Sequence, residues 1–352
     1  MKLLARAPEL QVYDCVEDFI TACPLGKNDL LLTNRYIFTP GKTEAQVLYQ
    51  EDYGKGEPSD EMFMAIHRQA RHGYQHVVCV GGGTVLDLAK LLSLNIKGDP
   101  YPYFTGEKPV AKRARLTLVP TTCGTGSEVT NIAVMAFERV GVKQGLANDA
   151  LFADEAALVP AFLAGLPYAG FAFSSLDALI HVIESWLSPK ATDATRLFAQ
   201  SACERILRCY RAIQKDGYEA RLPYLRDMLL ASTFAGLSFG TAGCATIHAM
   251  SYPFGSAYHV AHGEANYALL PATLRFYADR GCLDLPCGLT VSELLPMLEA
   301  VLPLKPLSAY GVRRDELPGF VGAVLKRQQR LLGNSPFTHD AQTIMAIYEL
   351  AY

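Results

Sequence analysis

The sequence lacks the marks of several protein classes. No stretch of about 18 apolar residues is free of charge, so no membrane-spanning helix is predicted. Basic residues are not in excess, because 32 lysines and arginines face 35 aspartates and glutamates, and the formal net charge is −3. No basic stripe offsets the acidic residues. We therefore expect neither a membrane nor a nucleic acid as a partner.

Paired cysteine motifs are also missing. The nine cysteines form no CxxC pair, and an odd number cannot all pair within one chain. We expect reduced, mostly buried thiols. The N-terminal residues lack the apolar core and the small-residue cleavage site of a secretory signal. These features lead us to expect a cytoplasmic protein.

The sequence has no repeat, low-complexity tract or flexible linker. Hydrophobic residues make up 50% of the 352 residues and charged residues 19%, which is a globular composition. At about 150 residues for each domain, this length suggests two domains.

The N-terminal part alternates short β-like runs with helical stretches, as in a parallel sheet covered by helices. Helical periodicity over 57–74 predicts a crossover helix, capped by Ser59 or Asp60 and carrying an apolar stripe of Met62, Ala65, Ile66 and Ala70. The clearest strand candidates are 29–34, 45–50, 76–80 and 116–122.

From about residue 160 onward, helical periodicity dominates. The longest periodic segments are 175–188, 194–214 and 222–242. We predict a Rossmann-like α/β dinucleotide-binding domain over 1–155 and an all-α domain, which would bind metal and substrate, over 156–352.

A glycine-rich turn follows the predicted strand at 76–80. Gly81, Gly82 and Gly83 lead into a helix that begins near Thr84 and contains Asp87. Backbone N–H groups at such a turn bind phosphate well, because glycine lets the anion approach closely. The alternative is an ordinary strand-to-helix turn, since the motif is not GxGxxG.

A second loop of this kind follows the strand at 116–122. If both loops leave the carboxyl ends of parallel strands, they line one crevice, which favours a dinucleotide over a single phosphate. The alternative is a solvated Ser/Thr loop. For Cys123 we favour a packed thiol over a nucleophile. Hydroxyl groups in the loop come from Thr121, Thr122, Thr125, Ser127 and Thr130.

Four potential metal ligands lie in the helical half. Asp177 and His181 are four residues apart and share a helical face, and His248 and His262 lie in a stretch rich in glycine and alanine. Carboxylate and imidazole suit Fe(II) or Zn(II), and an open site could polarise an alcohol oxygen. The alternative is an ordinary Asp–His pair on a helix.

These segments resemble the signatures of the iron-containing (group III) alcohol dehydrogenase family. The family's GGGSxxDxAK and PTTxGTGSE appear here as GGGTVLDLAK and PTTCGTGSE, and DALIHVIESWLS and HAMSYPFGSAYHVAHGEANYALLP resemble its two metal-binding signatures. The resemblance implies the dehydroquinate synthase-like fold and a metal-dependent hydride transfer between NAD and a small primary alcohol or aldehyde. Within the family the chain is most similar to the subgroup that interconverts 4-hydroxybutyrate and succinate semialdehyde with NAD.

The resemblance also implies roles for individual residues. The implied metal ligands are Asp177, His181, His248 and His262. The implied cofactor contacts are Gly81, Gly82, Gly83, Asp87, Thr121, Thr122, Thr125 and Lys143, to which we add Asn34, Thr84 and Ser127 from the same segments.

Two positions depart from the family pattern. Many members carry a second histidine four residues after the third ligand, where this chain has Tyr252, so a proton relay would use Tyr252, Tyr258, His259 or water. Many NAD-preferring members have Asp at the end of the second strand, where this chain has Asn34. We expect NAD, with NADP as the alternative.

A hydroxy-acid substrate would bring a second carboxylate, which needs a cation or several donors once it is desolvated. The candidates are Arg330, Arg327 and His259. The alternatives are a dehydrogenase for another small alcohol or diol, a lyase resembling dehydroquinate synthase, and a nucleotide-binding regulatory protein. As partners we expect the small alcohol or aldehyde and a further copy of the chain, in a homodimer.

Overall fold

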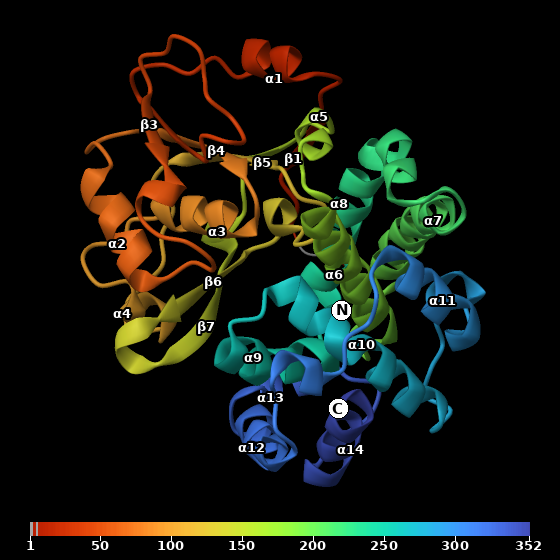
Figure 1. Cartoon of the computed structure of the whole chain (residues 1–352). Coiled ribbons are helices and arrows are strands. Elements are labelled where there is room, and N and C mark those ends of the chain that lie inside the picture. The colour runs from red at the N-terminus through yellow and green to blue at the C-terminus, as the bar shows by residue number, and fades with distance from the viewer. Residues whose placement is uncertain (1–2, 5) are drawn as a thin grey trace. The chain divides into compact units, whose positions relative to one another are not determined.

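The computed structural model describes residues 3–4 and 6–352, so residues 1, 2 and 5 of the predicted first domain lie outside the described residues. The chain forms two compact units (Figure 1). The α/β unit comprises Arg6–Thr122 and Gly126–Leu166. The helical unit comprises Cys123–Thr125 and Pro167–Tyr352, together with Leu3 and Leu4. This confirms the predicted fold class.

A six-stranded parallel sheet forms the centre of the α/β unit, in the order β1-β8-β5-β4-β2-β3. A separate antiparallel pair, β6 and β7, packs Ala133, Met135 and Phe137 into the same core. The strands are β1 (Glu9–Val12), β2 (Asp29–Thr33), β3 (Gln46–Tyr49), β4 (His76–Gly81), β5 (Arg115–Pro120), β6 (Ile132–Phe137), β7 (Val142–Ala147) and β8 (Glu155–Leu158).

Alternate residues of the central strands enter opposite cores. Leu30 and Leu32 of β2 lie in the core with helices α2 and α3, and Leu31 lies in the core with α1. Because both faces of the sheet are covered, these strands are continuous apolar runs rather than alternating ones. The helices of this unit are α1 (Val16–Ala22), α2 (Asp60–Gln69), α3 (Gly83–Leu92), α4 (Tyr101–Phe104) and α5 (Ala161–Ala164).

All four predicted strands are confirmed as β2, β3, β4 and β5, and the predicted crossover helix is α2. Ser59 caps α2, since its side chain accepts a hydrogen bond from the Met62 N–H at 3.2 Å. The sequence did not predict β1, β6, β7 or β8. Strand β8 has the sequence EAAL, and alanine and glutamate have little strand propensity, so burial in the sheet determines this strand.

The helical unit contains the three longest predicted helices, confirmed as α6, α7 and α8. Its helices are α6 (Tyr168–Leu187), α7 (Asp193–Asp216), α8 (Leu225–Ala242), α9 (Thr246–Tyr258), α10 (His262–Ala278), α11 (Val291–Val301), α12 (Leu317–Arg327), α13 (Gln329–Leu332) and α14 (Ala341–Ala351).

The division between the units differs from the predicted boundary at 155. Strand β8 pairs with β1 and β5, and α5 follows it, so the α/β unit continues to Leu166. The segment Cys123–Thr125, which we placed in the first domain, belongs to the helical unit.

Among the described residues, no single helix is long and apolar enough to cross a membrane, although the segments Tyr218–Ala242 and Thr246–Tyr258, bent by 103°, pass that test together on length and composition. All nine cysteines are free. Four are buried (Cys79, Cys123, Cys203 and Cys209) and five are partly exposed, so the thiols are less uniformly buried than we expected.

Candidate functional site

Helix α6 presents one polar face inside the helical unit. Asp177, His181 and Glu184 are at positions i, i+4 and i+7, and all three are buried. The residues between them on the helix are apolar and buried, which leaves a polar strip within a core. Buried ionisable groups are stable only when they are paired or bind an ion.

Helices α9 and α10 bring two further imidazoles to this strip. His248 Nε2 lies 3.0 Å from His181 Nε2 and 3.7 Å from Asp177 Oδ1. His262, whose side chain is partly exposed, places its Nε2 3.8 Å from the same carboxylate oxygen. Ligand atoms about 2.1 Å from one metal ion have roughly these mutual separations.

The four predicted ligands form two overlapping groups rather than one. Asp177, His248 and His262 have ligand atoms within 4.8 Å of one another, and so do His181, Cys244 and His248. His248 therefore belongs to both groups. Cys244 was not among the predicted residues.

Carbonyl and carboxylate acceptors determine the tautomers of two rings. Glu184 accepts from His248 Nδ1 at 2.7 Å, and the Gly124 carbonyl accepts from His181 Nδ1 at 3.2 Å. In the neutral rings both protons are therefore on Nδ1, and both Nε2 atoms carry lone pairs. Two such lone pairs 3.0 Å apart repel each other unless a proton or a metal cation lies between them. This arrangement fits a divalent metal whose imidazole ligands are oriented by hydrogen bonds from their other ring nitrogens.

Asn266, four residues after His262 on α10, completes the cluster. Its Nδ2 donates to Asp177 Oδ1 at 2.8 Å and lies 3.2 Å from His248 Nε2 and 3.3 Å from His262 Nε2. Its buried Oδ1 has no hydrogen-bond partner among the described residues. Three acceptors thus converge on one amide nitrogen, which is further evidence that this pocket of acceptors suits a cation.

The electrostatics follow from this crowding. Burial alone would raise the pKa of Asp177, but the adjacent His181, His262 and His248 rings lower it below its ordinary value. Burial opposes charge on His248, yet Cys244 and Glu184 raise its pKa well above its ordinary value. Burial likewise opposes the Cys244 thiolate, but His248 and His181 lower the pKa of this thiol to about 7. The cluster therefore favours one shared positive charge among its nitrogens.

Two glycines allow the backbones to approach α6. A Cβ at position 263 would collide with the Phe173 carbonyl, and one at position 124 would collide with Ser174. Any side chain at these positions would push α10 or the 123–125 segment away from α6. Both glycines therefore hold the ligands at their observed separations.

Cys123, beside Gly124, is a packed thiol. It is fully buried, its Sγ lies 3.5 Å from Ser174 Oγ, and burial raises its pKa to about 11. These properties agree with our preference for a structural cysteine.

The predicted phosphate loop lies where β4 ends and α3 begins. Gly82 precedes the helix in an extended conformation, and no side chain caps the first turn. The N-cap glycine therefore offers no side-chain acceptor to the first N–H groups of α3, which suits an anion-binding turn. A Cβ at Gly81 would collide with Val85, and one at Gly82 would lie 3.3 Å from Thr122. The Thr121 N–H donates to the Gly81 carbonyl at 3.1 Å, so the two loops are adjacent.

Several predicted cofactor residues contact other protein groups. Asp87 accepts from Ser127 Oγ at 2.7 Å and from the Val134 N–H at 2.9 Å, which ties α3 to the second loop and to β6. Thr84 Oγ1 donates to the Gly56 carbonyl at 3.0 Å. Thr125 belongs to the helical unit. Lys143 forms an ion pair with Glu57 at 2.7 Å.

Asn34 follows β2 beside a carboxylate that sequence reasoning missed. The pairing of β2 with β4 and β3 puts Asn34 next to Gly81 and Gln50 at the carboxyl ends of three neighbouring strands. Asn34 Nδ2 donates to Glu51 Oε2 at 2.9 Å, and the Arg35 N–H donates to Glu51 Oε1 at 2.8 Å. Glu51 therefore supplies an acidic group where the chain has Asn34 instead of Asp.

The proton-relay candidates lie in different surroundings. The Tyr252 ring lies 5.9 Å from the His262 ring, centroid to centroid. The Tyr258 hydroxyl donates to Glu316 Oε2 at 2.5 Å, and this bond raises the pKa of Tyr258. His259 is exposed and ends α9 with a left-handed φ of 52°. Tyr252 is therefore the candidate whose ring lies beside a predicted ligand.

The arginine candidates for the substrate carboxylate are both exposed, with Arg327 at the end of α12 and Arg330 on α13. Helix α13 packs on α9, the helix that carries His248.

Sequence signals could have found two of the missed residues. Glu184 continues the i, i+4 spacing of Asp177 and His181 to i+7, and Asn266 is at i+4 from His262. Cys244 and Glu51 come from turns, where no periodicity identifies the direction of a side chain.

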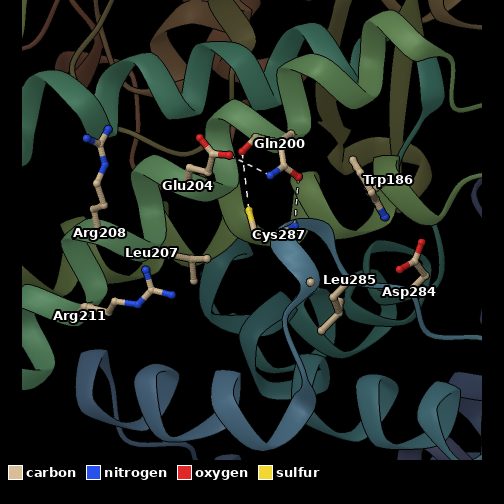
Figure 2. Close-up of a pocket in the computed structure, with 10 residues that line it drawn as sticks. Trp186, Gln200, Glu204, Leu207, Arg208, Arg211, Asp284, Leu285 and Cys287 are labelled. Atoms are coloured by element: carbon tan, nitrogen blue, oxygen red, sulfur yellow. Dashed lines mark hydrogen bonds between the residues drawn. The ribbon is translucent and has the colours of Figure 1, made fainter.

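A hollow of 760 Å³ elsewhere in the helical unit contains none of the predicted site residues. Figure 2 shows Arg208 and Arg211 at one end of it and Trp186 and Asp284 at the other. Its lining combines acidic and basic side chains and includes no proposed metal ligand, so we do not assign the active site to it.

Two segments of the chain match descriptions of one enzyme family. Residues 27–160 match "Iron-containing alcohol dehydrogenase". Residues 171–286 match "Fe-containing alcohol dehydrogenase family, C-terminal". The glycine-rich loop lies in the first segment, and all four predicted metal ligands lie in the second.

Relatives and solved structures agree with these matches. The chain is 39% identical over 371 residues to 4-hydroxybutyrate dehydrogenase of Clostridium kluyveri, with 100% of both chains covered. It is 33% identical to long-chain-alcohol dehydrogenase 1 of Geobacillus thermodenitrificans, covering 80% of this chain and 76% of the relative. The structure of sulfoacetaldehyde reductase from Bifidobacterium kashiwanohense in complex with NAD+ has the same fold, with a TM-score of 0.81 at 19% identity over 98% of this chain and 97% of the other.

The close approach of α10 to α6 gives a test of the cluster. We expect Gly263→Ala to lower the free energy of unfolding by about 1–3 kcal/mol, because the new methyl group collides with the Phe173 carbonyl. The same change should weaken metal retention, measured by elemental analysis after dialysis. Gly322→Ala, at an exposed glycine of α12 with open space around it, is the control and should not weaken either property. Equal metal retention in Gly263→Ala and the control would contradict this account of the cluster.

Proposed function

The chain belongs to the iron-containing alcohol dehydrogenase family, and from that premise we propose that it is an NAD-dependent, metal-containing dehydrogenase that interconverts 4-hydroxybutyrate and succinate semialdehyde. One observation carries the choice of substrate, which is the 39% identity over the full length of a relative named for 4-hydroxybutyrate. The convergent carboxylate and imidazoles of the helical unit support the choice of a metal-dependent reaction.

We propose Asp177, His181, His248 and His262 as the residues that would hold the metal, Fe(II) or Zn(II). When bound, a divalent ion supplies a Lewis acid for the alcohol or aldehyde oxygen, and NAD supplies the hydride acceptor. Glu184 and the Gly124 carbonyl accept from Nδ1 of His248 and His181, so the Nε2 atoms of the neutral rings are available to a cation.

The proton that leaves the alcohol needs an acceptor, and we propose Tyr252 as the first residue of that path because its ring adjoins His262. Tyr258 and His259 are its further candidates. The Tyr258 hydroxyl would first have to leave Glu316, which makes it a poorer first acceptor than Tyr252.

For the cofactor, we propose that the uncapped turn before α3 binds the pyrophosphate. Asp87 and Ser127 would position this turn through their mutual hydrogen bond rather than by touching the anion. The proposed set is Asn34, Gly81, Gly82, Gly83, Thr84, Asp87, Thr121, Thr122, Thr125, Ser127 and Lys143.

We further propose a cytoplasmic homodimer. The nine free thiols support a reducing compartment. The dimer follows from our expectation for the family, and light scattering of the purified protein would test it.

The substrate proposal predicts a preference for a charged alcohol. With NAD, after anaerobic reconstitution with Fe(II) or Zn(II), kcat/KM should be higher for 4-hydroxybutyrate than for 1-butanol or 1,4-butanediol. NADH should accumulate in step with aldehyde, which a lyase that retains its NAD would not produce. A higher value for either uncharged alcohol would reject 4-hydroxybutyrate as the substrate and leave the reaction class intact.

The carboxylate anchor can be tested by truncation. If Arg330 binds the distal carboxylate, Arg330→Ala should lower kcat/KM for 4-hydroxybutyrate by about 10- to 100-fold, the effect of losing a charge-assisted hydrogen bond. Activity on 1-butanol should stay within about twofold of the unmodified enzyme by the same reasoning. Arg327→Ala, at the end of α12, tests the second arginine candidate in the same two assays. Equal losses on both substrates would exclude Arg330 as the anchor.

The preference for NAD can be tested at Glu51. An acidic group at the end of the strand beside the glycine-rich loop repels a 2′-phosphate, and Glu51 is held there by Asn34 and Arg35. We expect Glu51→Gln to raise the ratio of NADP to NAD kcat/KM by about tenfold, because one repulsive charge is removed. Glu61→Gln, an exposed carboxylate on α2, should leave the ratio unchanged. An unchanged ratio in Glu51→Gln would remove this residue from the explanation.

A further inference from the structure

The turn between α8 and α9 presents a thiol to the metal cluster. Cys244 is partly exposed and lies four residues before His248. The peptide group that follows it is held at both of its polar atoms, because the Cys244 carbonyl accepts from Asn334 Nδ2 at 2.8 Å and the Ala245 N–H donates to Glu184 Oε2 at 2.8 Å. The carboxylate that orients His248 therefore also holds the backbone next to Cys244.

The Cys244 sulfur adjoins two of the proposed metal ligands. Its Sγ and the ring nitrogens of His181 and His248 all lie within 4.8 Å of one another. The second group, of Asp177, His248 and His262, shares His248 with the first. The cluster thus offers one donor set with a carboxylate oxygen and one with a sulfur.

We propose that the Cys244 sulfur is a further donor to the divalent metal of this centre, forming with His181 and His248 a soft N,N,S set. The inference rests on the proposed metal ligands, and it adds a residue that their pattern does not include. Binding replaces the thiol proton by the metal, and the proton passes to solvent. A sulfur donor favours zinc or cobalt over iron, because thiolate is a softer ligand than carboxylate.

The competing explanation is that the Cys244 thiol only donates a hydrogen bond to an imidazole nitrogen. Such a thiol would stabilise the metal-free cluster and would not touch the ion. The two explanations differ in one observable, a metal–sulfur bond.

Cobalt is the probe that reports this bond. We would remove metal from the full chain with a chelator, add one equivalent of Co(II) without oxygen, and record the absorption spectrum. We expect a sulfur-to-cobalt charge-transfer band in the near ultraviolet, together with the visible bands of bound cobalt. In Cys244→Ser and Cys244→Ala we expect the charge-transfer band to disappear while the visible bands remain.

Cys282→Ala is the matched control, since Cys282 is also a partly exposed thiol of the helical unit and its Sγ contacts the Arg280 carbonyl at 3.4 Å. It should keep the charge-transfer band. Thermal melts of all three variants would show that they are folded. Absence of the band in the unmodified protein, or its persistence in folded Cys244→Ala, would overturn the proposal.

Metal competition gives a second readout that does not depend on turnover. Loss of the sulfur donor should lower the affinity for Zn(II) by about tenfold or more, with a smaller effect on Fe(II). Equal losses for both metals would also overturn the proposal. A protein with the sulfur band but no activity on 4-hydroxybutyrate would contradict the proposed function alone.

Discussion

The arrangement of the polar cluster in the helical unit depends on the close approach of two imidazole nitrogens. The Nε2 atoms of His181 and His248 lie 3.0 Å apart, and in the neutral rings the proton is on Nδ1, facing the Gly124 carbonyl in His181 and Glu184 in His248. Such an arrangement is costly in a buried site unless a cation compensates it. Glu184 and the Gly124 carbonyl orient the two rings. Gly124 and Gly263 let their backbones approach α6 closely.

In the α/β unit, the parallel sheet brings the proposed cofactor-binding loops together. Its parallel strands end together, so Gly81, Asn34 and the segment after β3 are neighbours although they are distant in sequence. Glycine at the turn leaves N–H groups accessible, and the Asp87–Ser127 hydrogen bond holds the two loops in place. An acidic group near Asn34 comes from Glu51, one strand further along the sheet.

The sequence predicted what depends on local periodicity and failed where tertiary contacts decide. Strands β2 to β5 are continuous apolar runs, and α6 carries Asp177 and His181 on one face, so both were predictable. Strand β8 has the sequence EAAL and forms because the sheet buries it. The pairing of Glu184 with His248 and of Glu51 with Asn34 depends on how separate elements pack, which spacing along one element does not report. The domain boundary moved to Leu166 for the same reason, since β8 belongs to the sheet.

Glu184 accepts the Ala245 and Ile247 N–H groups as well as the His248 ring, so the first turn of α9 receives its cap from a residue 64 positions before its histidine. Helix α6 alone therefore does not form the complete set of proposed ligands, because His248 and His262 come from α9 and α10. Any ion that binds these side chains must therefore arrive after α9 and α10 have docked on α6.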